Sequence, residues 1–186
     1  KPDTAHLVKQ NGIAADRVFY ATHADYGGIH AFKTFDGIPV VKAAQVPDAD
    51  GSIVLASCCY SATLVRNGPL AASTSGTVVP LATPESMGLT YVHRGARAFI
   101  GFTAKVWVPD QIPSACFAGP LHRAFWKNVL ERDLPPARAL FEAKGEFILG
   151  MPYGNPDVAD GELTAATSLA KHLKDYWSVT CLGLGW

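Results

Sequence analysis

The chain has 186 residues, of which 48% are hydrophobic and 17% charged, which fits one globular domain with a substantial core and excludes a disordered chain. Lys and Arg number 16, and so do Asp and Glu, so charge gives no reason to expect a nucleic-acid partner. No apolar run approaches the ~20 residues that a membrane-spanning helix needs, so a membrane partner is not expected either.

The first part of the chain predicts a helix, a strand and a hairpin. A short helix is expected over residues 4–12. The run 17–22, RVFYAT, is compact and apolar enough to predict a strand buried on both faces. Residues 27–46 then alternate around Asp36-Gly37, and that dipeptide between two apolar stretches predicts a hairpin.

Two further apolar runs, 52–58 (SIVLASC) and 96–102 (ARAFIGF), predict buried strands. A loop rich in Ser, Thr, Gly and Pro and then a helix lie between them. The helix is predicted to have Thr83 as its N-cap, the following proline as its first residue, and Gly95 as its end.

The last part of the chain predicts three helices and a closing strand, over residues 119–133, 135–148, 160–176 and 177–184. The first of these helices carries an apolar face made by Leu121, Phe125, Val129 and Leu130. Strands that alternate with helices predict an α/β fold, in which a parallel or mostly parallel sheet is covered on both faces. No internal repeat or linker divides the chain, so a single domain over residues 1–186 is expected.

Reactive side chains stand at the ends of the first two buried strands, His23 on one and the pair Cys58-Cys59 on the other. Ligands bind at the carboxyl ends of strands in such sheets. A thiolate nucleophile needs a nearby base or cation, and His is the usual choice. Gly27 and Gly28 allow backbone to approach a substrate closely. Because Cys is among the most buried residue types, two core strands that end in His and Cys are the alternative interpretation.

Other kinds of site are not predicted. The four cysteines form no CxxC pattern, and no second pair of spaced ligands accompanies the vicinal cysteines, so no metal is expected. No Gly-rich phosphate loop follows any strand, which argues against a domain that binds small phosphorylated molecules, and no cofactor is expected. His30, in the hairpin, is a weaker candidate than His23. His93, His122 and His172 fall in predicted helices and are read as ordinary, and Cys116 and Cys181 are read as core or surface thiols.

The order strand–His, hairpin, strand–Cys, helix, GARAFIGF strand and helices, over roughly residues 17–184, resembles the caspase-like (clan CD) cysteine peptidase superfamily of gingipains, legumains, clostripain, separase and CHAT domains. The resemblance implies a three-layer α/β/α sandwich and a thiol protease, a hydrolase that cleaves peptide bonds with a His-Cys catalytic dyad. It implies that His23 is the base and Cys59 the nucleophile. Cys58 then takes the place of the small residue before the nucleophile, and Ser61 falls two residues after it. Cys58 is the alternative nucleophile.

The downstream segment RGARAFIGFTAKVWVPD, residues 94–110, is most similar to gingipains and CHAT domains. In gingipains a Trp of this loop walls the S1 pocket, which implies the same role for Trp107. Asp110 nearby would supply a counter-charge for a basic P1 side chain. The resemblance further implies oxyanion donors near Gly27 and at Cys59, and it gives Asp25 a role in orienting the catalytic His or in contacting substrate.

Two departures from the family pattern define the alternatives. His23 is followed by Ala-Asp-Tyr-Gly rather than directly by Gly, which favours the alternative function of a non-catalytic caspase-like module that binds or regulates a protein partner. Only 22 residues precede His23, too few for the preceding acidic residue and strand of the family. We therefore expect the chain to be a processed piece or domain of a longer protein. The implied partners are a protein or peptide substrate and another segment or subunit of the same precursor.

Overall fold

The computed structural model describes residues 14–24, 31–34, 37–65, 79–106, 118–150 and 165–183. Within α6, only the backbone is described for residues 165–169. The elements follow in this order: β1 (Arg17–Ala21), β2 (Ala31–Lys33), β3 (Pro39–Lys42), the 3-10 helix η2 (Ala43–Gln45), β4 (Ile53–Ser57), the 3-10 helix η3 (Thr83–Glu85), α3 (Met87–His93), β5 (Ala98–Phe102), α4 (Gly119–Leu130), α5 (Pro136–Leu149), α6 (Ala165–Ser178) and β6 (Val179–Leu182).

The sheet that positions the candidate site has four strands in the order β1-β4-β5-β6. The pairs β1-β4 and β4-β5 are parallel, whereas β6 runs antiparallel to β5. The strands β2 and β3 form a separate antiparallel hairpin. The predicted α/β fold with a mostly parallel sheet is therefore confirmed, and so is the hairpin, whose turn includes Gly37 at φ +85°.

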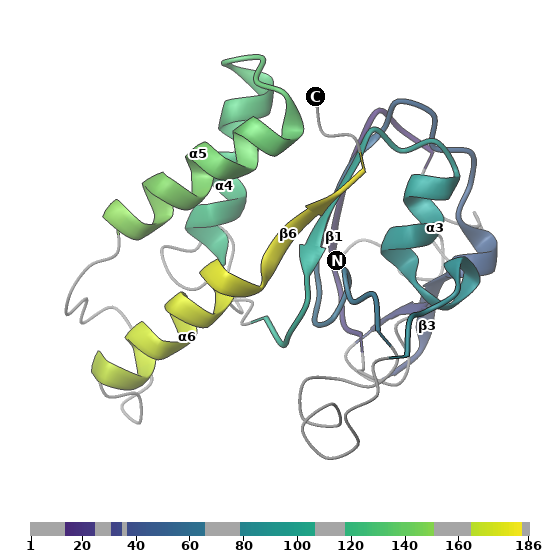
Figure 1. The fold of residues 1–186 in the computed structure, drawn as a ribbon, viewed down its shortest axis with the longest axis horizontal. Coiled ribbons are helices and arrows are strands. Elements are labelled where there is room, and N and C mark those ends of the chain that lie inside the picture. Colours follow the sequence, from purple (N-terminus) through teal and green to yellow (C-terminus); the bar gives the residue numbers. More distant parts are fainter. Residues whose placement is uncertain are drawn as a thin grey trace.

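Helices cover both faces of this sheet. On one face, core side chains of the sheet such as Tyr20 and Phe99 pack with α3 and the β2-β3 hairpin. On the other face, Leu55 and Phe102 pack with α4 and α5. Figure 1 shows α3 on one side of the sheet and α4 with α5 on the other, while α6 leads directly into β6. None of the helices in the described part of the chain is long and apolar enough to cross a bilayer.

The burial of the strands follows their place in the sheet. Every residue of β4 and β5 is buried, because both strands have neighbours on either side and helices above and below. In β1, by contrast, buried and exposed residues alternate, and Phe19 remains 43% exposed. The prediction that residues 17–22 are buried on both faces is wrong, because only one face of β1 is buried.

The helix after the Ser/Thr-rich loop begins later than predicted. Residues 83–85 form a 3-10 turn, and α3 starts after Ser86, whose Oγ accepts a hydrogen bond from the Leu89 N–H at 3.4 Å. Thr83 is therefore not the N-cap of the helix. Its carbonyl instead accepts a hydrogen bond from Thr90 Oγ1 at 2.7 Å. Gly95 follows the end of α3 at φ +91°, a left-handed conformation that favours glycine, as expected for a helix stop.

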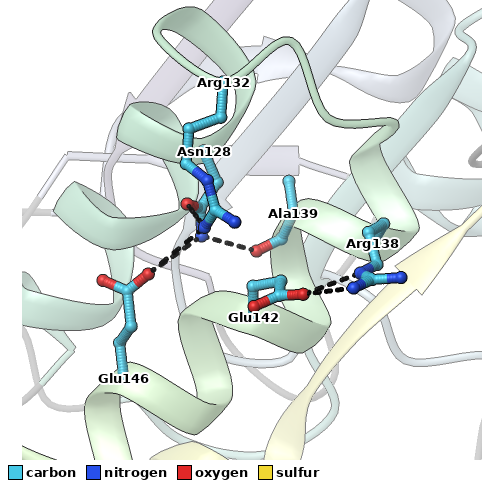
Figure 2. A network of polar contacts seen from close by, with 6 residues as sticks. All are labelled: Asn128, Arg132, Arg138, Ala139, Glu142 and Glu146. Carbon is cyan, nitrogen blue, oxygen red and sulfur yellow. Dashed lines mark hydrogen bonds and ion pairs between the residues drawn. The ribbon is translucent and has the colours of Figure 1, made fainter.

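A buried amide joins α4 to α5. Asn128 of α4 is fully buried, and its Nδ2 donates to the Ala139 carbonyl of α5 at 3.3 Å and to Glu146 Oε1 at 3.4 Å, as Figure 2 shows. Its Oδ1 accepts a hydrogen bond from Arg132 at 2.8 Å. The amide thus satisfies its donors and its acceptor between the two helices. Leu130, placed on the apolar face of α4 by the sequence, is 57% exposed, which corrects that prediction.

Candidate active site

The register of β1 and β4 fixes where the two reactive residues emerge. Ala21 is paired with Ser57 in the parallel ladder, and His23 and Cys59 each follow two residues later. Because side chains alternate between the faces of a strand, His23 shares the face of Ala21 and Cys59 shares that of Ser57. Both positions belong to the face that α4 and α5 cover, at the carboxyl edge of the sheet.

His23 is held by the hairpin. Its N–H donates to the Lys33 carbonyl at 2.8 Å, and its own carbonyl accepts from the Lys33 N–H at 2.7 Å. This bridge keeps the backbone extended beyond β1, so alternation of the side chains continues. Ala24 accordingly lies in the core on the α3 face, whereas His23 is half-buried.

Cys59 is half-buried and packs against the core between the sheet and the helices α4 and α5. Its Sγ accepts a hydrogen bond from the Val106 N–H at 3.4 Å and lies 3.6 Å from the Val106 carbonyl oxygen, to which the thiol can donate. The next residue, Tyr60, adopts φ +57°, a left-handed conformation that is uncommon outside glycine. The chain therefore turns sharply just after the candidate nucleophile.

Cys58 lies in a different environment although it is the adjacent residue. It is fully buried in the core of the opposite face, with Phe99 and Tyr91. Burial raises the pKa of the Cys58 thiol to about 12, so this thiol stays neutral near pH 7. A neutral, inaccessible thiol is a poor nucleophile. The alternation of β4 thus separates the two cysteines into a core thiol and a half-buried one.

The turn after Cys59 is supported by Ser61 and Gly101. The fully buried Ser61 hydroxyl donates to the Ala56 carbonyl at 3.1 Å and accepts from the Phe102 N–H at 3.0 Å, so it links β4 to β5 where the strands end. A Cβ on Gly101 would lie 2.6 Å from Ser61 Oγ. Gly101, the second glycine of the GARAFIGF run, therefore provides the space in which the turn lies on β5.

His122 was read from the sequence as an ordinary helical histidine, and it is buried against Phe19 of β1 and Phe102 of β5. Its ring contacts those of Phe19 and Phe102 edge-on, with centroids 5.6 and 5.9 Å away. Burial lowers the pKa of His122 to about 4, so the imidazole is neutral at pH 7. The helical spacing carried a signal of this burial, because His122 precedes Phe125 by three residues and Val129 by seven.

Two buried polar atoms on this face have no hydrogen-bond partner among the described residues, His122 Nε2 and Ser57 Oγ. Within the same residues, the Cys59 backbone N–H also has no protein acceptor. The described part of the chain contains no group of three potential metal ligands. Several predicted site residues lie outside the described residues, namely Asp25, Gly27, Trp107 and Asp110, so their roles stay predictions.

Comparison with known proteins assigns the chain to no family. No protein-family model matches it, and no curated protein does. Among solved structures, one titled "Structure of Protease" is similar with a TM-score of 0.47 and 16% sequence identity. The match covers 100% of this chain and 37% of that protein, so the chain spans well under half of the protein's length.

Proposed function

We propose that the chain is a cysteine endopeptidase in which His23 and Cys59 form the catalytic dyad. The observation that carries the proposal is the register of β1 and β4, from which both residues follow equivalent paired positions on neighbouring parallel strands. The contrast between the two cysteines supports Cys59 as the nucleophile. Cys59 is half-buried at the carboxyl edge, whereas Cys58 is a core thiol with a raised pKa.

The proposed reaction begins when His23 takes the proton of the Cys59 thiol. The thiolate then attacks the peptide carbonyl, and the new C–S bond produces a tetrahedral oxyanion. As the C–N bond breaks, His23 gives its proton to the leaving amine, which leaves an acyl-enzyme. A water molecule, deprotonated by His23, hydrolyses the thioester and regenerates the thiol.

Backbone donors would stabilise the oxyanion. The Cys59 N–H has no protein acceptor among the described residues, which is consistent with a donor that faces the substrate. The Tyr60 N–H is already used, because it donates to the Ala104 carbonyl at 3.0 Å. A second donor near Gly27 is proposed from the family resemblance.

Specificity is proposed on the same resemblance. Trp107 would wall the pocket for the P1 side chain, and Asp110 would contribute a counter-charge for a Lys or Arg. Asp25 would orient His23 or contact the substrate. The natural substrate is then a protein or peptide with a basic residue before the cleaved bond, and residues 1–186 would form one peptidase unit of a longer precursor.

The test measures release of a fluorophore from peptides with Lys, Arg, Asn or Leu at P1. We expect Cys59→Ala and His23→Ala to lower kcat/KM by about 10²-fold or more, since each removes a group that takes part in bond formation or proton transfer. Cys58→Ala removes only a core thiol and should retain activity. Full activity in Cys59→Ala, or loss of activity in Cys58→Ala alone, would overturn the assignment of the nucleophile.

The competing function is a non-catalytic module that binds a protein partner. Two results together would favour that function over the peptidase. The folded wild-type chain would cleave none of these peptides, and its Cys59 would not react with a peptidyl thiol-directed inhibitor at pH 7.

A further inference from the structure

The thiol of Cys59 contacts the backbone of one residue, Val106, through both its N–H and its carbonyl. The N–H donates to Sγ at 3.4 Å, and the carbonyl oxygen lies 3.6 Å from Sγ. Val106 follows β5 by four residues, and its own side chain is only 7% exposed in the core beside α4 and α5. The backbone of Val106 is therefore anchored where it meets the thiol.

A ladder of hydrogen bonds holds the segment 103–106, here called the strap, against the turn after Cys59. The Ala62 N–H donates to the Phe102 carbonyl and the Tyr60 N–H to the Ala104 carbonyl, each at 3.0 Å. Residues 62, 60 and 59 of the turn thus meet residues 102, 104 and 106 in turn. The two segments therefore run antiparallel. The first bond ends at Phe102, the last residue of β5, and the second holds the strap itself, which then meets Cys59 through the side-chain sulfur.

A second anchor fixes the start of the strap to the end of α6. The Thr103 N–H and Oγ1 both donate to the Ser178 carbonyl, at 2.9 and 3.1 Å. The strap is therefore held at Thr103, at Ala104 and through the buried side chain of Val106. Three anchors over four residues leave the Val106 N–H little freedom to move away from Sγ.

We propose that Val106 is a positioning residue for the reaction, whose backbone N–H holds Cys59 Sγ and stabilises it as a thiolate. This inference rests on the proposed role of Cys59. In the neutral thiol, Sγ can donate its proton to the Val106 carbonyl while it accepts from the N–H. Once the proton has moved to His23, only the N–H bond remains, and it becomes charge-assisted and stronger.

The same geometry links the thiol to the predicted specificity loop. Val106 is followed directly by Trp107, and Asp110 comes three residues later. Val106 is thus placed between the candidate nucleophile and the residues proposed to bind the P1 side chain.

The test removes the Val106 N–H and follows alkylation of Cys59 by iodoacetamide, with peptide mapping to separate it from Cys58. A backbone ester at position 106, made by incorporating the α-hydroxy analogue of valine, replaces the N–H by oxygen and keeps the side chain. An ester at Lys105 is the matched control, because the Lys105 N–H has no hydrogen bond among the described residues. Val106→Pro with Lys105→Pro provides a second pair by ordinary mutagenesis.

We expect loss of the Val106 N–H to slow alkylation at pH 7 by about tenfold, while the rate at about pH 10, where a free thiol is already mostly ionised, stays within about twofold. The Lys105 control should match the wild type at both pH values. An unchanged rate at pH 7 in the Val106 ester, or an equal loss in the control, would overturn the proposal. Because alkylation needs no peptidase activity, this result is independent of whether the chain cleaves peptides.

Discussion

At the level of single residues, Cys58 and Cys59, which follow the end of β4, lie in different environments. Cys58 points into the core on the α3 face, where burial raises its pKa to about 12, while Cys59 lies on the other face and contacts the backbone of Val106. The difference comes from the two-residue period of a strand rather than from the residue type. A vicinal pair at a strand end can therefore place its two thiols on opposite faces of the sheet.

His122 gives a pH-dependent stability at the same scale. Its pKa falls from 6.5 in the unfolded chain to about 4 in the folded protein, because burial disfavours the imidazolium. Between these values the unfolded chain binds more protons, so the free energy of unfolding rises as pH increases from about 4 to 6.5, in total by about 3 kcal/mol. Replacing this residue by a ring that does not titrate removes this contribution.

His122→Phe retains an aromatic ring between Phe19 and Phe102 but has no group that titrates there. We therefore expect its free energy of unfolding to fall less between pH 7 and pH 5 than that of the wild type. Urea unfolding at the two pH values measures the difference. His93→Phe, at an exposed position in α3, is the control and should keep the pH dependence of the wild type. A wild-type pH dependence in His122→Phe would show that the buried imidazole does not cause it.

At the scale of elements, the turn after Cys59 depends on its close packing against β5. An added Cβ at Gly101 would lie 2.6 Å from Ser61 Oγ and 2.8 Å from the Phe99 ring, so the turn or the strand must shift. Gly145, within α5, has nothing within 4 Å of such a Cβ. At Gly101 an alanine would be destabilising because it has no room, whereas at Gly145 only the low helix propensity of glycine is at stake.

We expect Gly101→Ala to lower the free energy of unfolding by about 1–3 kcal/mol through overpacking. Gly145→Ala should raise it by about 0.5–1 kcal/mol, since alanine is the better helix former. Denaturant unfolding monitored by circular dichroism measures both changes. If Gly101→Ala is as stable as the wild type, the turn does not lie on β5 as closely as described.

At the scale of the whole molecule, the alternation of strands and helices was predictable because each apolar run has a clear length and a clear boundary. The sequence predicted β4, β5 and the three late helices for this reason. It misplaced the burial of β1, because an apolar run does not reveal whether both faces of the strand will be covered. The N-cap was also misplaced, because Thr83 and Ser86 are both good capping residues and only the packing of α3 selects between them.

The candidate site was predictable only in part. Both reactive residues end apolar runs, so their place at the carboxyl edge followed from the fold class. The contact between Cys59 and Val106 was not predictable, because it joins a side-chain sulfur to the backbone of a residue 47 positions away, and sequence patterns do not encode such a contact. The burial of His122 had a helical signal, but its ring contacts depend on how α4 packs across β1 and β5.

The central claim is that His23 and Cys59 act together at the edge where β1 and β4 end. The most direct measurement is the rate at which iodoacetamide alkylates Cys59 between pH 5 and 9, in the wild type, in His23→Ala and in the control His93→Ala. We expect His23→Ala to slow alkylation at pH 7 by roughly tenfold or more, because the thiol loses its base, and the control to be unchanged. Equal rates for Cys59 in the wild type and in His23→Ala would show that His23 does not act on the Cys59 thiol.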